Sequence, residues 1–422
     1  MLFFMKKRRF DAEGWLGCAL KSALAAVLLV CTLLPLASGV ANAPDTLRLR
    51  EGGQWEWDFL LPVKTQILDN QQVISSTDER LGVRLTAQEE GNASLQFSFM
   101  GVPMRTIEVS VEPRKVLIPG GHSIGVAIRT KGVLVVGMSD LGGAVKSPAR
   151  QAGVKAGDWI EAVNGQAVTD SEQLSQLVND QSGDILLTVS RNGEQRQVTL
   201  TSETDVRDGV RRLGVWVRDS TAGVGTLSFY DPESGNFGAL GHPITDVDTG
   251  QQLTVGQGEI LKSQVVRITP GEKGQPGELM GSFLDQAESW GSVDKNTQVG
   301  IYGTCSQPIE NPLFPNGVEM LSSDEVHQGA AQLLTTLEGD EICAYDCEIT
   351  KISHQRDQTE RNMVVRITDE KLLQKTGGIV QGMSGSPILQ DGKLAGAVTH
   401  VLVNDPTMGY GIFIENMLEA AG

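Results

Sequence analysis

The residues best suited to bond-breaking chemistry lie near the end of the chain, in segment 382–387, which reads Gly-Met-Ser-Gly-Ser-Pro. A serine between two glycines can occupy a tight turn that exposes its hydroxyl while neighbouring N–H groups converge on one point, as an oxyanion hole requires. By position Ser384 is the predicted nucleophile, and the N–H groups of Gly382 and Ser384 are predicted to hold an oxyanion; an ordinary Gly-Ser-Pro loop is the alternative. Ser386 is the alternative nucleophile.

A serine nucleophile needs a base, and His242 has the most suggestive surroundings of the five histidines. It lies in segment 237–243, Phe-Gly-Ala-Leu-Gly-His-Pro, where glycines and a proline define a turn well upstream of the serine. His400 follows the serine motif on an apolar run and is expected to line the site or to pack beneath it. These positions predict acyl-enzyme chemistry in which His242 takes the proton of Ser384.

A third residue must orient the imidazole, and nine aspartates lie between the histidine and the serine. Asp246 and Asp248 are too close to His242 in sequence to pair with it easily across a cleft. Asp369 closes a strand-like run shortly before the serine turn, so it can reach a neighbouring loop. A solvated carboxylate at a strand end is the equal alternative for Asp369, and composition does not choose among the nine aspartates.

The elements that must position these residues are strands. From 213 to 422 the sequence offers many alternating apolar and polar runs, which are typical of half-buried strands, and few long helical patterns. We predict a barrel-like, all-β domain over 213–422. Segment 44–119 alternates in the same way over short runs separated by Gly, Pro and Asn, which predicts a small β domain.

The intervening segment, 120–204, resembles a PDZ domain. It contains Ala-Gly-Val-Lys-Ala-Gly-Asp-Trp-Ile at 152–160, Val-Asn-Gly at 163–165 and a hairpin closed near Asn-Gly at 192–193. A PDZ domain binds peptide C-termini or internal segments as an added strand. We predict that this peptide-binding loop is formed by Ser123, Ile124, Gly125 and Val126. The alternative is that these four residues begin a core strand, and the charged stretch 205–212 is predicted to be a linker.

The first 43 residues have the pattern of a signal peptide or a membrane anchor. Four basic residues at 6–9 precede an apolar stretch that is uncharged from 22 to 40. This length is closer to the ~20 residues of a spanning helix than to the ~7 to 15 of a cleaved signal, yet Ala-Asn-Ala at 41–43 resembles a cleavage site. Both fates predict that the chain beyond residue 43 is exported.

The composition limits the classes of function. A chain of 422 residues holds two or three domains, and its net charge of −17 repels phosphate backbones, so nucleic acid is not an expected partner. Three cysteines follow the N-terminal segment: Cys305, Cys343 and Cys347. Their odd number argues against a full disulfide framework, and we expect them to be packed residues rather than metal ligands.

Three longer motifs complete the pattern: Gly-Ala-Leu-Gly-His-Pro-Ile at 238–244, Gln-Gly-Met-Ser-Gly-Ser-Pro-Ile at 381–388, and Ala-Val-Thr-His-Val-Leu-Val-Asn-Asp-Pro at 397–406. Together with the apolar N-terminus and the PDZ-like segment, they resemble the stage IV sporulation protein B peptidases, which are chymotrypsin-like serine proteases. The resemblance implies a mainly β fold and a catalytic triad of His242, Asp369 and Ser384, without a metal or an organic cofactor.

The resemblance also implies a biology. It predicts a signalling protease that is exported from the forespore into the space between the two spore membranes and cleaves itself. Its protein substrate would be an extracytoplasmic regulatory subunit of an intramembrane protease, whose release activates sigma-factor processing during sporulation.

Two other hypotheses about the function compete with this one. The runner-up is a non-catalytic PDZ scaffold whose protease-like domain is only a binding platform, and labelling by a serine-reactive fluorophosphonate separates it from an enzyme. A zinc protease is the weaker alternative, because the sequence contains no His-Glu-x-x-His.

Overall fold

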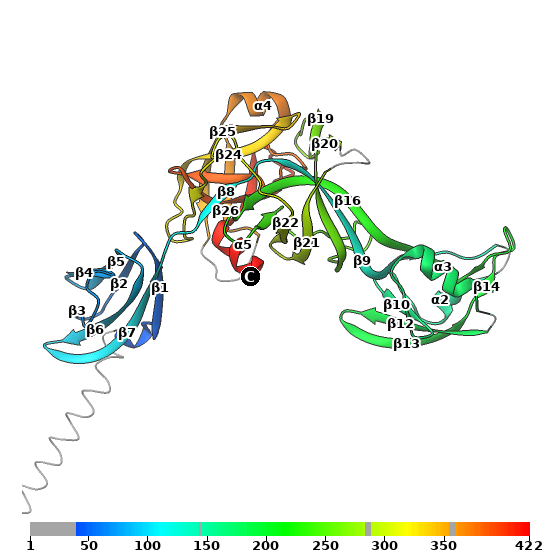
Figure 1. The fold of residues 1–422 in the computed structure, drawn as a ribbon, viewed down its shortest axis with the longest axis horizontal. Coiled ribbons are helices and arrows are strands. Elements are labelled where there is room, and N and C mark those ends of the chain that lie inside the picture. Colours follow the sequence, from blue (N-terminus) through cyan, green and yellow to red (C-terminus); the bar gives the residue numbers. More distant parts are fainter. Residues whose placement is uncertain (1–38, 143–144, 182, 283–287, 354–359) are drawn as a thin grey trace, which may run out of the picture. The chain divides into compact units, whose positions relative to one another are not determined.

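The computed structural model describes residues 39–142, 145–181, 183–282, 288–353 and 360–422. The predicted signal or anchor of 1–43 lies outside the described residues except for its last five. Within the described ranges, no helix is both long and apolar enough to cross a membrane. The chain divides after Arg114 into two compact units (Figure 1).

The unit that ends at Arg114 consists of a four-stranded and a three-stranded sheet that share one hydrophobic core. In strand β6 the side chains of Ala93, Leu95 and Phe97 are buried and their neighbours are not, which is the period of two of a half-buried strand. The strands are β1 (Thr46–Arg50), β2 (Gln54–Asp58), β3 (Lys64–Ile67), β4 (Ile74–Glu79), β5 (Gly82–Ala87), β6 (Gly91–Phe99) and β7 (Val102–Glu112).

The unit Lys115–Gly422 contains two six-stranded rings, which together give the mainly β fold predicted for a chymotrypsin-like protease. In the first ring the order is β9-β18-β21-β22-β17-β16, and β16 pairs back onto β9. Its strands are β9 (Ser123–Met138), β16 (Val215–Tyr230), β17 (Asn236–Ala239), β18 (Val255–Lys262), β21 (Ser289–Thr297) and β22 (Gly300–Cys305).

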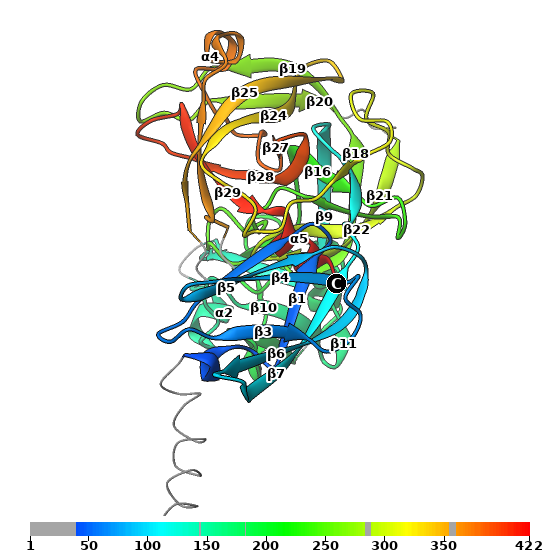
Figure 2. The ribbon, with the colours of Figure 1, turned by 90° about the vertical axis from the view of Figure 1, so that its left-hand side faces the viewer.

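The second ring is a closed barrel in the order β24-β25-β26-β29-β28-β27, seen in Figure 2. Its strands are β24 (Gly329–Glu338), β25 (Glu341–Ile352), β26 (Met363–Ile367), β27 (Pro387–Gln390), β28 (Lys393–Val401) and β29 (Met408–Phe413). Short elements flank the rings: β8 (Val116–Pro119), β19 (Gln264–Thr269), β20 (Glu278–Ser282), β23 (Val318–Glu319), α4 (Glu370–Thr376) and α5 (Ile414–Ala421).

The PDZ region lies between β9 and β16. Its elements are α2 (Pro148–Gln151), β10 (Trp159–Val163), β11 (Gln166–Ala167), α3 (Ser171–Asn179), β12 (Asp184–Arg191), β13 (Glu194–Thr201), β14 (Glu203–Thr204) and β15 (Arg211–Arg212). β12 and β13 form the predicted hairpin, because Asn192 and Gly193 both adopt the left-handed backbone that a two-residue turn requires.

The linear order predicted from the sequence, a PDZ domain of 120–204 followed by a protease domain of 213–422, requires a correction. Residues 123–129 of β9 and 220–226 of β16 pair with each other in the first ring. Farther along the same two strands, 134–138 pair with 215–218 in the PDZ region. The PDZ region is therefore inserted into the first ring through two continuous strands.

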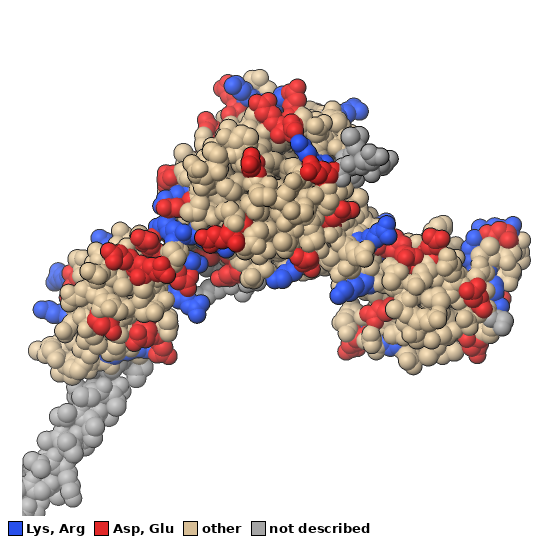
Figure 3. Space-filling view, in the orientation of Figure 1, with Lys and Arg blue, Asp and Glu red and all other residues tan. Residues whose placement is uncertain are grey.

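Charged side chains of both signs are interspersed over the face of the molecule drawn in Figure 3.

Candidate active site

Ser384 lies on a turn just before β27. The flanking glycines Gly382 and Gly385 both have a φ of 95°, a backbone conformation that side chains disfavour. A Cβ at Gly385 would lie 2.0 Å from the carbonyl oxygen of Thr226, so this position accepts only glycine. Ser384 Oγ donates a hydrogen bond of 2.8 Å to the carbonyl oxygen of Thr399. The small residues on either side of Ser384 therefore allow the tight turn. In this conformation the Ser384 hydroxyl is bonded to a backbone carbonyl.

The N–H groups of this turn fall into two sets. Those of Met383, Gly385 and Ser386 are each bonded to a backbone carbonyl. Within the part of the chain that the structure describes, no acceptor is bonded to the N–H of Gly382 or of Ser384. These two groups, which are the ones predicted to hold an oxyanion, remain available for a ligand.

His242 follows β17 through a second tight turn. Leu240 and Gly241 have φ values of 69° and 70°, and a Cβ at Gly241 would lie 2.8 Å from the Thr399 methyl carbon. His242 Nδ1 lies 2.9 Å from the carbonyl oxygen of Pro243. Because a carbonyl only accepts, Nδ1 carries the proton, and Nε2 keeps the lone pair that a general base needs.

The structure brings the predicted base and nucleophile to one cavity of about 770 Å³. His242, Ser384 and Gly382 line it together with Glu360 and His400. The two imidazole rings are 4.9 Å apart between centroids. Burial lowers the pKa of His242 below its usual range, so the ring is held in the neutral form that accepts a proton.

His400, on β28, lines the site. This is one of the two alternatives that the sequence predicted for it. Burial is the main cause that lowers its pKa to about 4, and the positive charges of Arg361 and of His242 in its protonated form act in the same direction. Among the described residues its buried Nδ1 has no hydrogen-bond partner. His400 is therefore a neutral second imidazole beside the base.

Asp369, the acid implied by the family resemblance, is not among the residues that line this cavity. It is the N-cap of α4, where its carboxylate accepts hydrogen bonds from the N–H groups of Lys371 at 2.9 Å and Leu372 at 3.0 Å. The carboxylate in the cavity lining belongs to Glu360. The structure thus gives Asp369 a capping role and does not bring it to His242.

Ser386, the alternative nucleophile, is fully buried. Its hydroxyl has no hydrogen-bond partner among the described residues. A substrate cannot reach it without rearrangement, so the geometry favours Ser384.

The predicted peptide-binding loop requires a correction. Ser123, Ile124, Gly125 and Val126 are buried residues of β9 that pair with β16 on one side. Ile124, Gly125 and Val126 also pair with β18 on the other side. A strand with a neighbour on each side has no edge to which a peptide can add, so these residues begin a core strand, which was the alternative interpretation.

The strand edge that is open to a peptide lies instead at the start of β16. A cavity of about 500 Å³ separates α3 from the start of β16, and its apolar lining includes Leu174 and Val178 of the helix with Leu213, Val215 and Trp216. Over 215–217, β16 pairs only with β9 among the described strands, so its other edge can accept a peptide strand. We refer to this cavity as the α3–β16 groove. The signal that sequence reasoning missed is Leu-Gly-Val at 213–215, which repeats the pattern of Ile-Gly-Val at 124–126.

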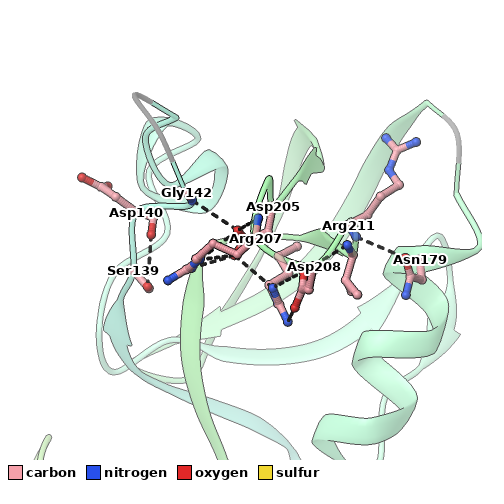
Figure 4. A network of polar contacts seen from close by, with 10 residues as sticks. Ser139, Asp140, Gly142, Asn179, Asp205, Arg207, Asp208 and Arg211 are labelled. Atoms are coloured by element: carbon pink, nitrogen blue, oxygen red, sulfur yellow. Dashed lines mark hydrogen bonds and ion pairs between the residues drawn. The ribbon is translucent and has the colours of Figure 1, made fainter.

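The stretch 205–212, predicted as a linker, is a folded turn that borders the groove (Figure 4). Asp205 is buried and accepts hydrogen bonds from Arg207 at 2.6 Å and from Arg212 at 2.9 Å. Arg212 also binds Asp208 at 2.5 Å. The Arg207 guanidinium holds the pKa of the Asp205 carboxyl well below its usual range. The ion pairs fix this turn in place beside the groove.

Comparison with known families covers the two regions just described. Residues 209–418 match the family model of SpoIVB peptidase S55, and residues 142–191 match that of a PDZ domain.

Individual relatives match shorter pieces. The chain is 31% identical over 102 residues to a protein of Lactococcus lactis subsp. lactis (strain IL1403) named as zinc metalloprotease LL2128, covering 24% of this chain and 22% of that protein. It is 34% identical over 116 residues to a protein of Chlamydia trachomatis serovar D named as a DegP-like periplasmic serine endoprotease, covering 27% and 20%. The chain thus spans about a fifth of the length of each relative.

Among solved structures, the crystal structure of Rv3671c from M. tuberculosis H37Rv in an inactive form is 13% identical, with a TM-score of 0.25. The match covers 47% of this chain and 82% of that one.

Proposed function

Since residues 209–418 form a serine endopeptidase domain of the SpoIVB peptidase S55 family, we propose that the whole chain is an exported, membrane-associated endopeptidase that acts in sporulation signalling. Its proposed substrates are the chain itself and an extracytoplasmic regulatory protein of an intramembrane protease. The observation that carries the catalytic part is that His242, Gly382 and Ser384 line one cavity and that the N–H groups of Gly382 and Ser384 have no acceptor among the described residues.

The proposed reaction begins with a rotation of Ser384 Oγ away from the carbonyl of Thr399 and toward His242 Nε2. Nε2 takes the hydroxyl proton as Oγ attacks the scissile carbonyl, and the N–H groups of Gly382 and Ser384 bind the resulting oxyanion. His242 then gives the proton to the leaving amine, and water hydrolyses the acyl-enzyme by the same path. In this scheme the Pro243 carbonyl fixes the tautomer of the base.

The triad role of Asp369 stays a prediction of the family resemblance. It requires that the carboxylate leave the first turn of α4, where it accepts two backbone hydrogen bonds. Export and membrane association rest on residues 1–43, and the α3–β16 groove supports the proposed binding of peptide segments.

A second candidate is a scaffold without activity. It is favoured by one observation, that Ser384 Oγ is bonded to a backbone carbonyl rather than to the base. A fluorophosphonate distinguishes the two, because it reacts only with an activated serine.

The test is labelling of the full wild-type chain beside Ser384→Ala, with Ser386→Ala as the matched control. We expect labelling of the wild type and of Ser386→Ala, and none of Ser384→Ala. Mass spectrometry of the same three chains should show self-cleavage products that require Ser384. An unlabelled wild type that is folded would refute the enzyme and leave the scaffold.

A further inference from the structure

Strand β16 connects the two sites of this molecule. Its first residues, Val215–Val217, form the open edge of the α3–β16 groove. Residues 221–224 of the same strand line the catalytic cavity. Farther along, the N–H of Thr226 donates to the Ser384 carbonyl at 2.9 Å, and Thr226 Oγ1 donates to the Gly382 carbonyl at 2.8 Å. Figure 1 shows β16 and β9 running together from the first ring into the PDZ region.

Arg218 lies between these two parts of the strand and binds the segment that carries the base. One guanidinium nitrogen contacts Asp246, and the other lies 2.8 Å from Asp248. These aspartates follow His242 by four and six residues. Asp246 is buried and also accepts hydrogen bonds from the N–H and hydroxyl of Thr249, so it organises the turn after the base.

The next residue, Asp219, binds the other wall of the groove. Its carboxylate accepts hydrogen bonds from the N–H of Ser171 at 2.7 Å and from the Ser171 hydroxyl at 2.6 Å, at the start of α3. The pairing of β16 with β9 is irregular just before and just after Arg218. Arg218 and Asp219 are thus adjacent at an irregular point of β16. Asp219 binds the start of α3, and Arg218 binds the segment that follows His242.

We propose that Arg218 is a positioning residue for His242, and that occupation of the α3–β16 groove changes its hold on the segment 242–248. A peptide that pairs with 215–217 and packs on α3 contacts the two elements that flank Arg218 and Asp219. Such a ligand shifts the site only if it binds one arrangement of β16 better than the other. The resting arrangement is the one described, with Ser384 bonded to the Thr399 carbonyl. This inference rests on the proposed serine endopeptidase activity.

The first experiment measures the fluorophosphonate labelling rate and the kcat and KM for a small p-nitrophenyl ester. Arg218→Met removes both ion pairs and keeps the length of the side chain. We expect about a tenfold lower labelling rate and kcat with KM within about twofold, because a displacement of about 1 Å at a base can cost up to ~10²-fold. Arg218→Lys, which can reach one carboxylate, should restore part of the rate. Arg196→Met on the exposed strand β13 is the matched control and should equal the wild type.

Loss of Arg218 leaves the buried Asp246 without a cation, which can prevent folding. Asp248→Asn avoids this problem, because Asp248 is half exposed and the contact with Asp246 remains. We expect about a threefold lower kcat for Asp248→Asn, a smaller loss than for Arg218→Met, because the remaining ion pair with Asp246 limits the displacement of the base. Thermal unfolding of each variant verifies that it is folded.

The second experiment tests the link to the groove. Ser175 is an exposed residue of α3 that lines the groove, so Ser175→Trp fills the groove without disturbing the core. The labelling rate is compared for the wild type, Ser175→Trp, Arg218→Met and the double variant. We expect Ser175→Trp to change the rate at least about threefold in the wild-type background and less than about twofold beside Arg218→Met, as coupled residues behave.

The possible failures are distinct. A folded wild type that is not labelled refutes the proposed function. A labelled wild type with Arg218→Met and Asp248→Asn at wild-type rates overturns the positioning role alone. An equal effect of Ser175→Trp in both backgrounds, or no effect in either, overturns the coupling to the groove.

Discussion

Two segments of this chain carry the same pattern, an apolar residue followed by Gly and Val, and lie in opposite environments. Ile124-Gly125-Val126 is a buried part of β9 with β16 on one side and β18 on the other. Leu213-Gly214-Val215 leads into β16 beside a groove, and over 215–217 this strand pairs only with β9 among the described strands. The number of neighbouring strands, rather than the pattern itself, separates a core position from a binding position.

The same rule applies to groups that donate or accept hydrogen bonds, because a group that already has a partner in the fold is not available to a ligand. The N–H groups of Gly382 and Ser384 have no partner among the described residues, and both residues line a cavity, whereas the Asp369 carboxylate is already engaged by a helix. Four measurements sharpen or break this comparison.

The largest effect is expected for Gly125→Val. A branched side chain inserted between two strands overpacks the first ring, which should lower the free energy of unfolding by about 1–3 kcal/mol. Cleavage of a protein substrate and hydrolysis of a small ester should fall together, because the residue belongs to the catalytic body. A loss confined to the protein substrate would return 123–126 to the peptide-binding site.

A smaller effect is expected for Trp216→Ser at the open edge. The Trp216 side chain is 64% exposed, an unusual value for so large an apolar group and one that suits a ligand contact. A random peptide library with free C-termini is selected on the full wild-type chain, and the affinity of the best peptide is then measured by fluorescence polarisation. We expect about fivefold weaker binding to Trp216→Ser, as is typical of a contact residue at the edge of a binding site. Unchanged binding would mean that peptides attach elsewhere.

The pH dependence of ester hydrolysis follows from the buried base. The pKa of His242 is lowered by burial, and only the neutral ring accepts the serine proton, so activity should be lost as pH falls through this lowered pKa. The acid midpoint of kcat/KM should therefore lie below about 6.5, the ordinary value for histidine. Trp216→Ser should leave that midpoint in place. A midpoint above 6.5 would show that a carboxylate partner stabilises the imidazolium in the working enzyme.

The smallest effect is expected for Asp369→Asn. Asparagine caps a helix about as well as aspartate, and the Pro243 carbonyl already fixes the tautomer of His242. We therefore expect kcat within about threefold of the wild type, a size appropriate to a residue outside the reacting groups. A loss of about 10⁴, the cost of a misoriented base in a triad, would instead establish the acid implied by the family resemblance.

What the sequence predicted well depends on local backbone. The turns that hold His242 and Ser384 are defined by glycines within a few residues, and the hairpin of β12 and β13 is defined by Asn192 and Gly193. Each of these features is decided by the conformations that a residue and its immediate neighbours can adopt.

The features that the sequence predicted poorly depend on residues that lie far away along the chain. The environment of Ile124 is decided by β16 and β18, which lie about a hundred residues or more farther along the chain. None of these contacts leaves a periodic trace in the sequence.

The insertion of the PDZ region into the first ring has a consequence for the order in which this protein folds. To pair 123–129 with 220–226, the chain must bring together ends separated by about 90 residues, and closing a flexible loop of that length costs about 4 kcal/mol of chain entropy. A PDZ region that is already folded removes most of this cost, because it pairs 134–138 with 215–218 at the base of the loop. The inserted region is thus a folding template for the ring that holds the base, and damage to its core would appear as a failure to assemble the protease.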